Sequence, residues 1–135
     1  MNIKIITDSV SDIPKDLIKK YNIEVLPLSV NFKNKVYNDG VDLTTKEFFE
    51  KLSKMENLPK TSQVTPGRFL ESFEKNLKNY DKIICITMSK KMSGTYQAAL
   101  TARKMIGDRK KDIDVFDSKA ISFGYGLVVL KAALD

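Results

Sequence analysis

The chain has 135 residues, which suits a single domain, and it contains one cysteine and no histidine. The missing histidine excludes a Ser-His-Asp triad, a Cys-His pair and a histidine-ligated metal site. The lone cysteine excludes a disulfide framework and a cysteine-based zinc site. The net charge is +6, but the lysines are interspersed with acidic residues, so we expect a solvated surface and no nucleic-acid partner.

No apolar run approaches the roughly 20 residues that a membrane span requires. Residues 1–6 are typical of a short strand and lack the layout of a signal peptide. We therefore expect a cytoplasmic protein with no stable membrane insertion. Cys85 stands between isoleucines and is expected to be a small buried core residue.

The first part of the chain predicts two strands, a helix and a hairpin. Residues 3–7 form an apolar run that ends in a polar turn, and Pro14 then opens a helix. Residues 23–30 form a second apolar run, which Pro27 shifts toward the edge of a sheet. This run continues into a short hairpin with polar residues 33–35 at its turn.

The middle of the chain predicts two helices and a strand. Thr44 or Thr45 caps the first helix. Residues 60–67, with three hydroxyls and an amide, are expected to be a loop, and Pro66 opens the next helix. The apolar run 82–87 then predicts a buried strand.

The last part of the chain begins with the hydroxyl-rich stretch 89–97, which leads into an alanine-rich helix. Residues 113–116 predict a short strand, and residues 122–135 a final helix. In that helix, Gly124 and Gly126 would let the first turn approach another segment closely.

Strands therefore alternate with helices, and three strands are apolar throughout, which is the pattern of a parallel sheet buried on both faces. The sequence predicts an α/β fold of three layers, with a mostly parallel sheet between helices and a small β-hairpin beside it. We expect residues 1–135 to form one domain. The chain ends in an apolar helix near residues 121–135, and we expect a partner domain to be missing after it.

Small polar residues follow three of the predicted strands, and the carboxyl ends of parallel strands form the usual ligand-binding edge of such a sheet. A fourth hydroxyl segment precedes a helix and can reach the same edge. Hydroxyls and helix-start amides suit a carboxylate or a phosphate. No G-x-G-x-x-G motif follows the first strand, so a hydride-transfer cofactor is not expected. The four segments contain Asp8-Ser9, Ser93-Gly94-Thr95, Asp117-Ser118 and Thr61-Ser62.

The same residue types also cap helices and turns. For Asp8, Ser9, Asp117 and Ser118 we favour capping over ligand contact. For Thr61 and Ser93, composition leaves the two interpretations equally open.

The sequence resembles the DegV family at five segments, which occur in the family's order. Val64 stands where family members often carry proline, and Lys90 where a second serine is common. The segments are Thr7-Asp8-Ser9 with Asp12, Asp39-Gly40-Val41-Asp42-Leu43, Thr61-Ser62-Gln63 with Thr65-Pro66, Met92-Ser93-Gly94-Thr95-Tyr96-Gln97-Ala98-Ala99, and Asp117-Ser118 with Ser122-Phe123-Gly124-Tyr125-Gly126.

The resemblance implies the N-terminal domain of a two-domain α/β protein that binds one long-chain fatty acid between its domains. Thr61 and Ser93 would hydrogen-bond the carboxylate, with Ser62 and the backbone of Gly94 and Thr95 nearby. Since the chain has no histidine and no complete catalytic motif, we expect that the protein is not itself an enzyme and that it uses no cofactor and no metal. A separate fatty-acid kinase would phosphorylate the bound acid for phospholipid synthesis. Without the second domain, we expect this chain to bind lipid weakly or not at all.

Two other functions remain open at this point. One is an enzyme acting on a phosphorylated or nucleotide substrate, with Asp8 as nucleophile and the Ser93 loop holding phosphate. Val10 stands where a phosphatase-like magnesium site would need a second carboxylate. The other is a flavin binder, because the Ser-Gly-Thr loop resembles the phosphate loops of flavodoxin-like folds, although those loops follow the first strand.

Overall fold

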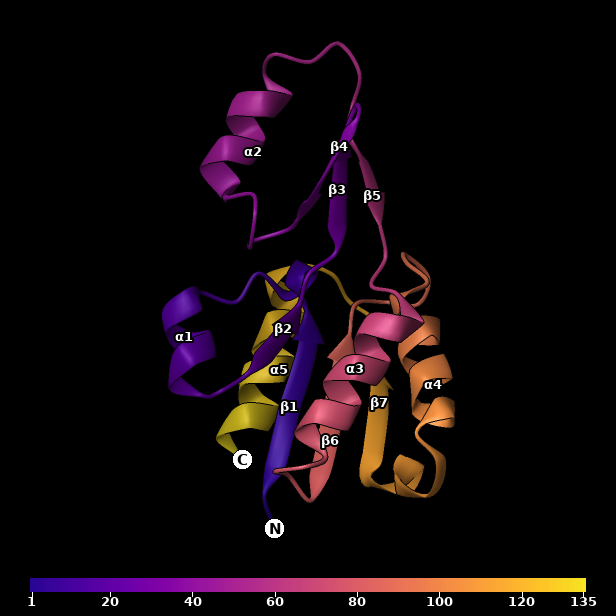
Figure 1. Cartoon of the computed structure of the whole chain (residues 1–135). Coiled ribbons are helices and arrows are strands. Elements are labelled where there is room, and N and C mark those ends of the chain that lie inside the picture. Colours follow the sequence, from indigo (N-terminus) through magenta and orange to yellow (C-terminus); the bar gives the residue numbers. More distant parts are fainter.

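Four parallel strands form the main sheet of the computed structural model, which describes all 135 residues. Their order is β2-β1-β6-β7, so β1 and β6 lie at the centre (Figure 1). Most residues of these two strands are buried, which explains why their sequences are apolar runs without alternation. The strands are β1 (Ile3–Asp8), β2 (Glu24–Leu26), β6 (Lys82–Thr87) and β7 (Ile113–Asp117).

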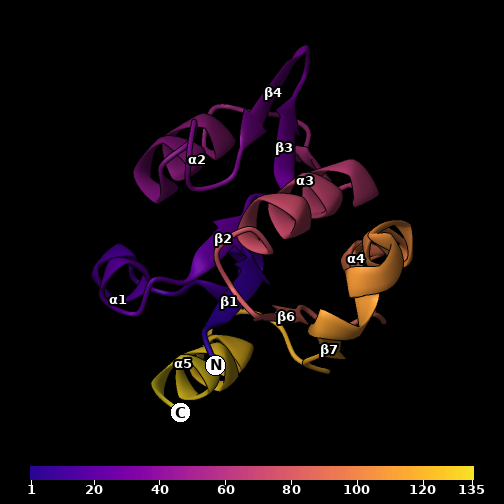
Figure 2. The same ribbon diagram turned by 60° about the horizontal axis from the view of Figure 1, so that its bottom comes forward.

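Helices cover both faces of this sheet. α3 and α4 pack side by side on one face, and α5 lies on the other face against β1 (Figure 1, Figure 2). The fully buried Phe69 and Phe73 of α3 and Val129 of α5 fill the space between the layers. The predicted three-layer α/β fold is therefore confirmed. The helices are α1 (Lys15–Lys20), α3 (Pro66–Asn76), α4 (Thr95–Met105) and α5 (Phe123–Leu134), with the 3-10 helices η1 (Ser9–Ser11) and η2 (Gly107–Asp112).

A smaller antiparallel sheet stands above the carboxyl ends of the main strands (Figure 1). Its strand order is β4-β3-β5, and we call residues 29–62, which contain it, the insertion unit. The unit has its own small core of Val30, Phe32 and Leu43, with Phe48 packed edge-on against Phe32 at a ring distance of 5.8 Å. Its elements are β3 (Ser29–Phe32), β4 (Lys35–Asn38), α2 (Thr45–Leu52) and β5 (Lys60–Ser62).

The insertion unit confirms the predicted hairpin, since β3 and β4 pair across the turn. Thr44 is the N-cap of α2 and forms a capping box with Glu47. None of the helices of the protein combines the length and the apolar character that crossing a membrane requires.

Two predicted boundaries are wrong. The apolar run 23–30 is not one strand, because β2 belongs to the main sheet and β3 to the insertion unit. Pro27 lies at the break and has no N–H to continue the ladder. Residues 60–67 are not all loop, because β5 pairs with β3 at Val30–Thr61 and Ser29–Ser62. β5 is a polar, exposed edge strand, so no apolar pattern reveals it.

The prediction for the α5 glycines holds at one of the two positions. A Cβ atom at Gly126 would lie 2.3 Å from the carbonyl oxygen of Ser11, so α5 approaches η1 as closely as only glycine allows. Gly124 has no neighbour within 4 Å of the corresponding position, so no close approach requires it.

Candidate functional site

The loop between β6 and α4 is folded by its own hydroxyl groups. The backbone N–H groups of Met92 and Ser93 donate to the carbonyl of Ser89, and the N–H of Lys91 donates to the Ser89 hydroxyl at 3.2 Å. These bonds turn the chain sharply after β6 and bring Ser93 to the start of α4. Ser93 itself is half-buried.

Ser93 and Thr95 form a hydroxyl pair at the N-terminus of α4. The Ser93 Oγ accepts the N–H of Thr95 at 3.2 Å and lies 2.9 Å from the Thr95 Oγ1. When Thr95 donates in this pair, the Ser93 proton is free to bind an acceptor. The N-cap residue Gly94 offers no side chain, and the N–H groups of Tyr96 and Gln97 find no protein acceptor. This end of α4 therefore presents one hydroxyl and two backbone donors to a negatively charged group.

Thr61 and Ser62 extend from opposite faces of β5, because successive strand residues alternate. Thr61 pairs with Val30 and lies on the face that carries the small core of the insertion unit. Ser62 pairs with Ser29 on the other face. Both side chains are exposed. The two neighbouring hydroxyls therefore do not face the same space.

The two predicted hydroxyl segments meet where Gln63 lies against Gly94. A Cβ atom at Gly94 would be 2.0 Å from the Gln63 Oε1, so the glycine makes room for this side chain. Gln63 directly follows Ser62, and Gly94 directly follows Ser93. The structure thus brings the end of β5 and the start of α4 together at the carboxyl edge of the main sheet.

Asp8 is fully buried and both of its carboxylate oxygens are bonded. Oδ1 accepts the N–H of Val10 at 3.0 Å and the phenol of Tyr125, and Oδ2 accepts the N–H of Met88 at 2.9 Å. Burial raises the pKa of the Asp8 carboxyl above its ordinary value of 3.8, although the three donated bonds oppose the shift. Burial and the nearby Asp8 charge likewise raise the pKa of Tyr125.

Asp8 therefore fastens β1 to α5 and to the start of the Ser93 loop, and no oxygen is exposed to attack a substrate. The hypothesis of an Asp8 nucleophile has no support in this geometry. No group of three or more acidic or cysteine side chains lies close enough together to hold a metal ion.

The other three candidate supporting residues also bond within the protein. Ser9 Oγ accepts the N–H of Leu28 at 3.1 Å. Asp117 Oδ1 accepts the N–H groups of Lys90 and Lys119, and Ser118 closes a turn on Ala120. The bonds of Asp117 and Ser118 to residues 119 and 120 match the capping interpretation of the sequence. Ser9 instead bonds to a residue 19 positions later in the chain, so it acts as neither a local cap nor a turn.

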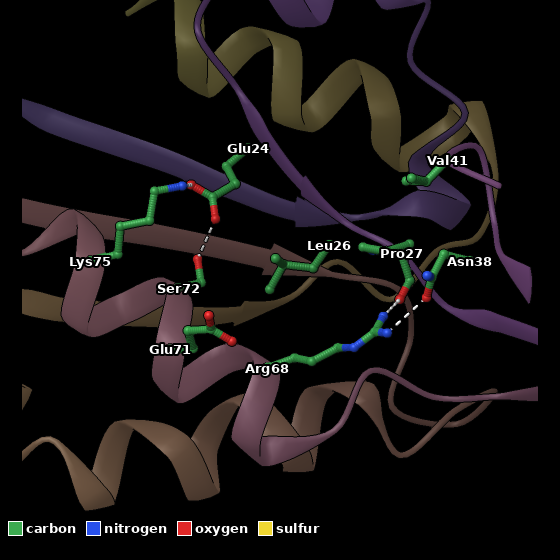
Figure 3. Close-up of a pocket in the computed structure, with 9 residues that line it drawn as sticks. All are labelled: Glu24, Leu26, Pro27, Asn38, Val41, Arg68, Glu71, Ser72 and Lys75. Atoms are coloured by element: carbon green, nitrogen blue, oxygen red, sulfur yellow. Dashed lines mark hydrogen bonds and ion pairs between the residues drawn. The ribbon is translucent and has the colours of Figure 1, made fainter.

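A polar pocket of about 260 Å³ lies where β2, α3 and the insertion unit meet. Figure 3 shows Arg68 reaching across it from α3, with Glu24 and Ser72 joined at its other end. Sequence reasoning missed both Arg68 and the Gln63–Gly94 contact. No local sequence pattern marks either feature, because each depends on a contact between residues that are far apart in the sequence.

Comparison with known proteins settles the family. A family model described as "Uncharacterised protein, DegV family" matches residues 2–134. The chain belongs to the DegV family. A DegV domain-containing protein of Caldanaerobacter subterraneus is 49% identical over 131 residues, which are 97% of this chain and 46% of that protein. The chain thus spans about half the length of this relative.

Two solved structures share the fold. The crystal structure of DegV from Bacillus subtilis, described as a fatty acid binding protein, matches 99% of this chain and 47% of its own, with a TM-score of 0.91 and 37% identity. A stearic acid-binding protein of Eubacterium ventriosum matches 98% of this chain and 46% of its own, with a TM-score of 0.90 and 29% identity. The main sheet and the insertion unit together are therefore the DegV-like fold.

Proposed function

We propose that this protein binds a long-chain fatty acid and holds its carboxylate between Ser93, the first turn of α4 and Thr61. The observation that carries the proposal is the hydroxyl pair and the unpaired N–H groups at the start of α4, beside the end of β5. The descriptions of DegV from Bacillus subtilis and of the Eubacterium ventriosum protein as fatty-acid binders give the ligand class.

Ser93 and the α4 amides suit a carboxylate for two physical reasons. The N-terminus of a helix carries about half a positive elementary charge, which favours an anion. A carboxylate accepts several short hydrogen bonds from hydroxyl and N–H donors, and each bond to a charged group contributes about 1.5–3 kcal/mol. The site contains no side-chain base that could take part in chemistry, so the proposal is one of binding rather than catalysis.

The two hydroxyl side chains of β5 are given different roles because side chains alternate between the two faces of a strand. Thr61 and Ser62 cannot both face one carboxylate, since they extend from opposite faces of the strand. We assign the direct contact to Thr61, and Ser62 a place near the site. Gly94 contributes room for Gln63, and Thr95 orients the Ser93 hydroxyl.

The proposal extends to the acyl chain and to a partner. The relatives that are described as fatty-acid binders are about twice as long as this chain, so we propose that a second domain encloses the acyl chain and that this domain alone binds weakly. We further propose that a fatty-acid kinase receives the carboxylate for phosphorylation. The resemblance at the five sequence segments supports that step.

Fatty-acid binding is tested by organic extraction of the purified protein with mass spectrometry, and by titration with a radiolabelled C16 or C18 acid. Ser93→Ala and Thr61→Val should each weaken binding about 10-fold to 100-fold, the equivalent of one charge-assisted hydrogen bond. Thr101→Val is the matched control, because Thr101 lies further along α4 and donates only to the Gln97 carbonyl. Unchanged affinity in both site variants would contradict the proposal.

The contribution of a second domain is tested by the same titration on full-length DegV from Bacillus subtilis. We expect that protein to bind more tightly than this chain. Equal affinities would show that the second domain adds nothing to fatty-acid binding.

For the kinase step, purified fatty-acid kinase, ATP and acid-loaded protein should yield an acyl phosphate that hydroxylamine traps as a hydroxamate. The kinase step would be contradicted if the amount of hydroxamate were the same with and without this protein.

A further inference from the structure

The insertion unit is joined to the main sheet by only two chain crossings. The chain enters the unit through Pro27 and Leu28 and leaves it through residues 63–65. Leu28 and Val64 anchor these crossings in the main core, where they are 7% and 1% exposed. The unit itself packs around a separate core. Something beyond the two crossings must therefore fix how the unit is oriented above the main sheet.

Arg68 connects α3 with both the first crossing and the insertion unit. Its Nη1 donates to the carbonyl of Pro27 at 3.1 Å, and its Nη2 donates to the Oδ1 of Asn38 at 2.7 Å (Figure 3). Asn38 is the last residue of β4. Arg68 is half-buried, and it is the only side chain of α3 that hydrogen-bonds to the insertion unit. Its planar guanidinium suits two acceptors at a fixed angle.

The acceptor of Arg68 is itself held in place. The backbone N–H and the Nδ2 of Asn38 both donate to the Oδ2 of Asp42, at 2.9 and 2.8 Å. This arrangement leaves the Asn38 Oδ1 directed at Arg68. The bonds from Leu28 N–H to Ser9 and from Asp39 N–H to Leu28 fix the backbone nearby. Arg68 thus completes a continuous set of bonds around the first crossing.

We propose that Arg68 is a positioning residue for the carboxylate site, an inference that rests on the proposed function. Thr61 belongs to the insertion unit and Ser93 to the main body. The two hydroxyls bind one carboxylate together only while both bodies keep one relative orientation, and loss of that preorganisation weakens binding without removing any ligand contact. Arg68 fixes this orientation through Pro27 and Asn38.

The orientation is measured by the distance between two nitroxide labels, one at Lys46→Cys on α2 and one at Lys104→Cys on α4. Both positions are exposed, whereas Cys85 is buried and stays unlabelled. In Arg68→Ala the distance distribution should become at least twice as wide as in the wild-type background. A lysine at this position can reach only one acceptor at a time, so the width of the distribution in Arg68→Lys should lie between those of the wild-type background and Arg68→Ala.

Arg109→Ala is the matched control. The Arg109 guanidinium also binds a backbone carbonyl, that of Leu77, but both residues belong to the main body. This variant should leave the distance distribution unchanged. Asn38→Ala provides a second route to the same loss, because it removes one acceptor and keeps the arginine. Asn38→Ala should also widen the distance distribution, and this result can be obtained even if Arg68→Ala fails to fold.

The fatty-acid titration completes the test. Arg68→Ala should bind about 10-fold more weakly than the wild type, and Arg109→Ala within twofold of it. An unchanged distance distribution in both Arg68→Ala and Asn38→Ala would overturn the inference, and so would a wide distribution with full affinity. Absence of binding by the wild type would instead contradict the proposed function, and the label distances would still decide whether Arg68 fixes the insertion unit.

Discussion

The two glycines of α5 provide a matched pair of substitutions with opposite expected effects. An alanine Cβ at Gly126 would lie 2.3 Å from the Ser11 carbonyl oxygen, and also 3.1 Å from Phe123 Cδ2. The backbone oxygen must move to at least 3.0 Å, which displaces η1 from α5. Overpacking of this kind costs about 1–3 kcal/mol. Gly126→Ala should therefore lower the free energy of unfolding by that amount.

Gly124→Ala is the control in the same helix. No atom lies within 4 Å of its new Cβ, so the alanine meets open space. Helix propensity then favours alanine by up to about 1 kcal/mol, and the stability should stay the same or rise. The assay is urea unfolding followed by circular dichroism, which gives the free energy of unfolding of each variant. Thermal unfolding of the same proteins should show a Tm shift of about 4 °C per kcal/mol. Equal effects of the two substitutions would refute the close approach of α5 to η1.

Three further predictions concern Asp8, Tyr125 and Thr95. The pKa of Asp8 is raised in the folded state, so the folded protein keeps the Asp8 proton to a higher pH than the unfolded chain does. The free energy of unfolding, measured relative to Asp8→Asn, should therefore fall as the pH rises from about 3.8 through the folded pKa. Urea unfolding of both proteins between pH 3.5 and 8 measures this difference, and a flat or rising difference would contradict it. Tyr125→Phe removes one donor to Asp8 and should cost about 1–3 kcal/mol in the same assay, whereas wild-type stability would contradict the buried bond. Thr95→Val removes the hydroxyl that orients Ser93 and should weaken fatty-acid binding about tenfold with little change in Tm; unchanged binding would exclude that role.

Much of the fold follows from local patterns in the sequence. The apolar runs of β1 and β6 are long enough to identify the central strands, the shorter run of β7 identifies a strand beside them, and caps such as Thr44 mark helix starts. β5 escapes prediction because it is short, polar and paired only by backbone bonds to a distant strand. The run through Pro27 also looks continuous, although the chain changes sheets there.

The candidate site was predictable in its residue types but not in its geometry. The hydroxyls of Thr61 and Ser93 stand out in the sequence, yet only the pairing of β5 shows that Thr61 and Ser62 face opposite ways. The residue type of Asp8 and its position at the end of a strand are those of a ligand or a nucleophile. Its burial against Tyr125 depends on a helix more than 100 residues later, and no local pattern carries that information.

Nuclear magnetic resonance of the backbone amides tests the carboxylate site most directly, because it detects weak binding. The ¹⁵N-labelled protein is titrated with lauric acid and, separately, with its methyl ester, which has the same acyl chain without the charge. We predict that the acid shifts the amide signals of Tyr96 and Gln97, that the ester leaves them in place, and that Ser93→Ala greatly reduces the response. Signals that do not move, or that move equally with the ester, would contradict carboxylate binding at the start of α4.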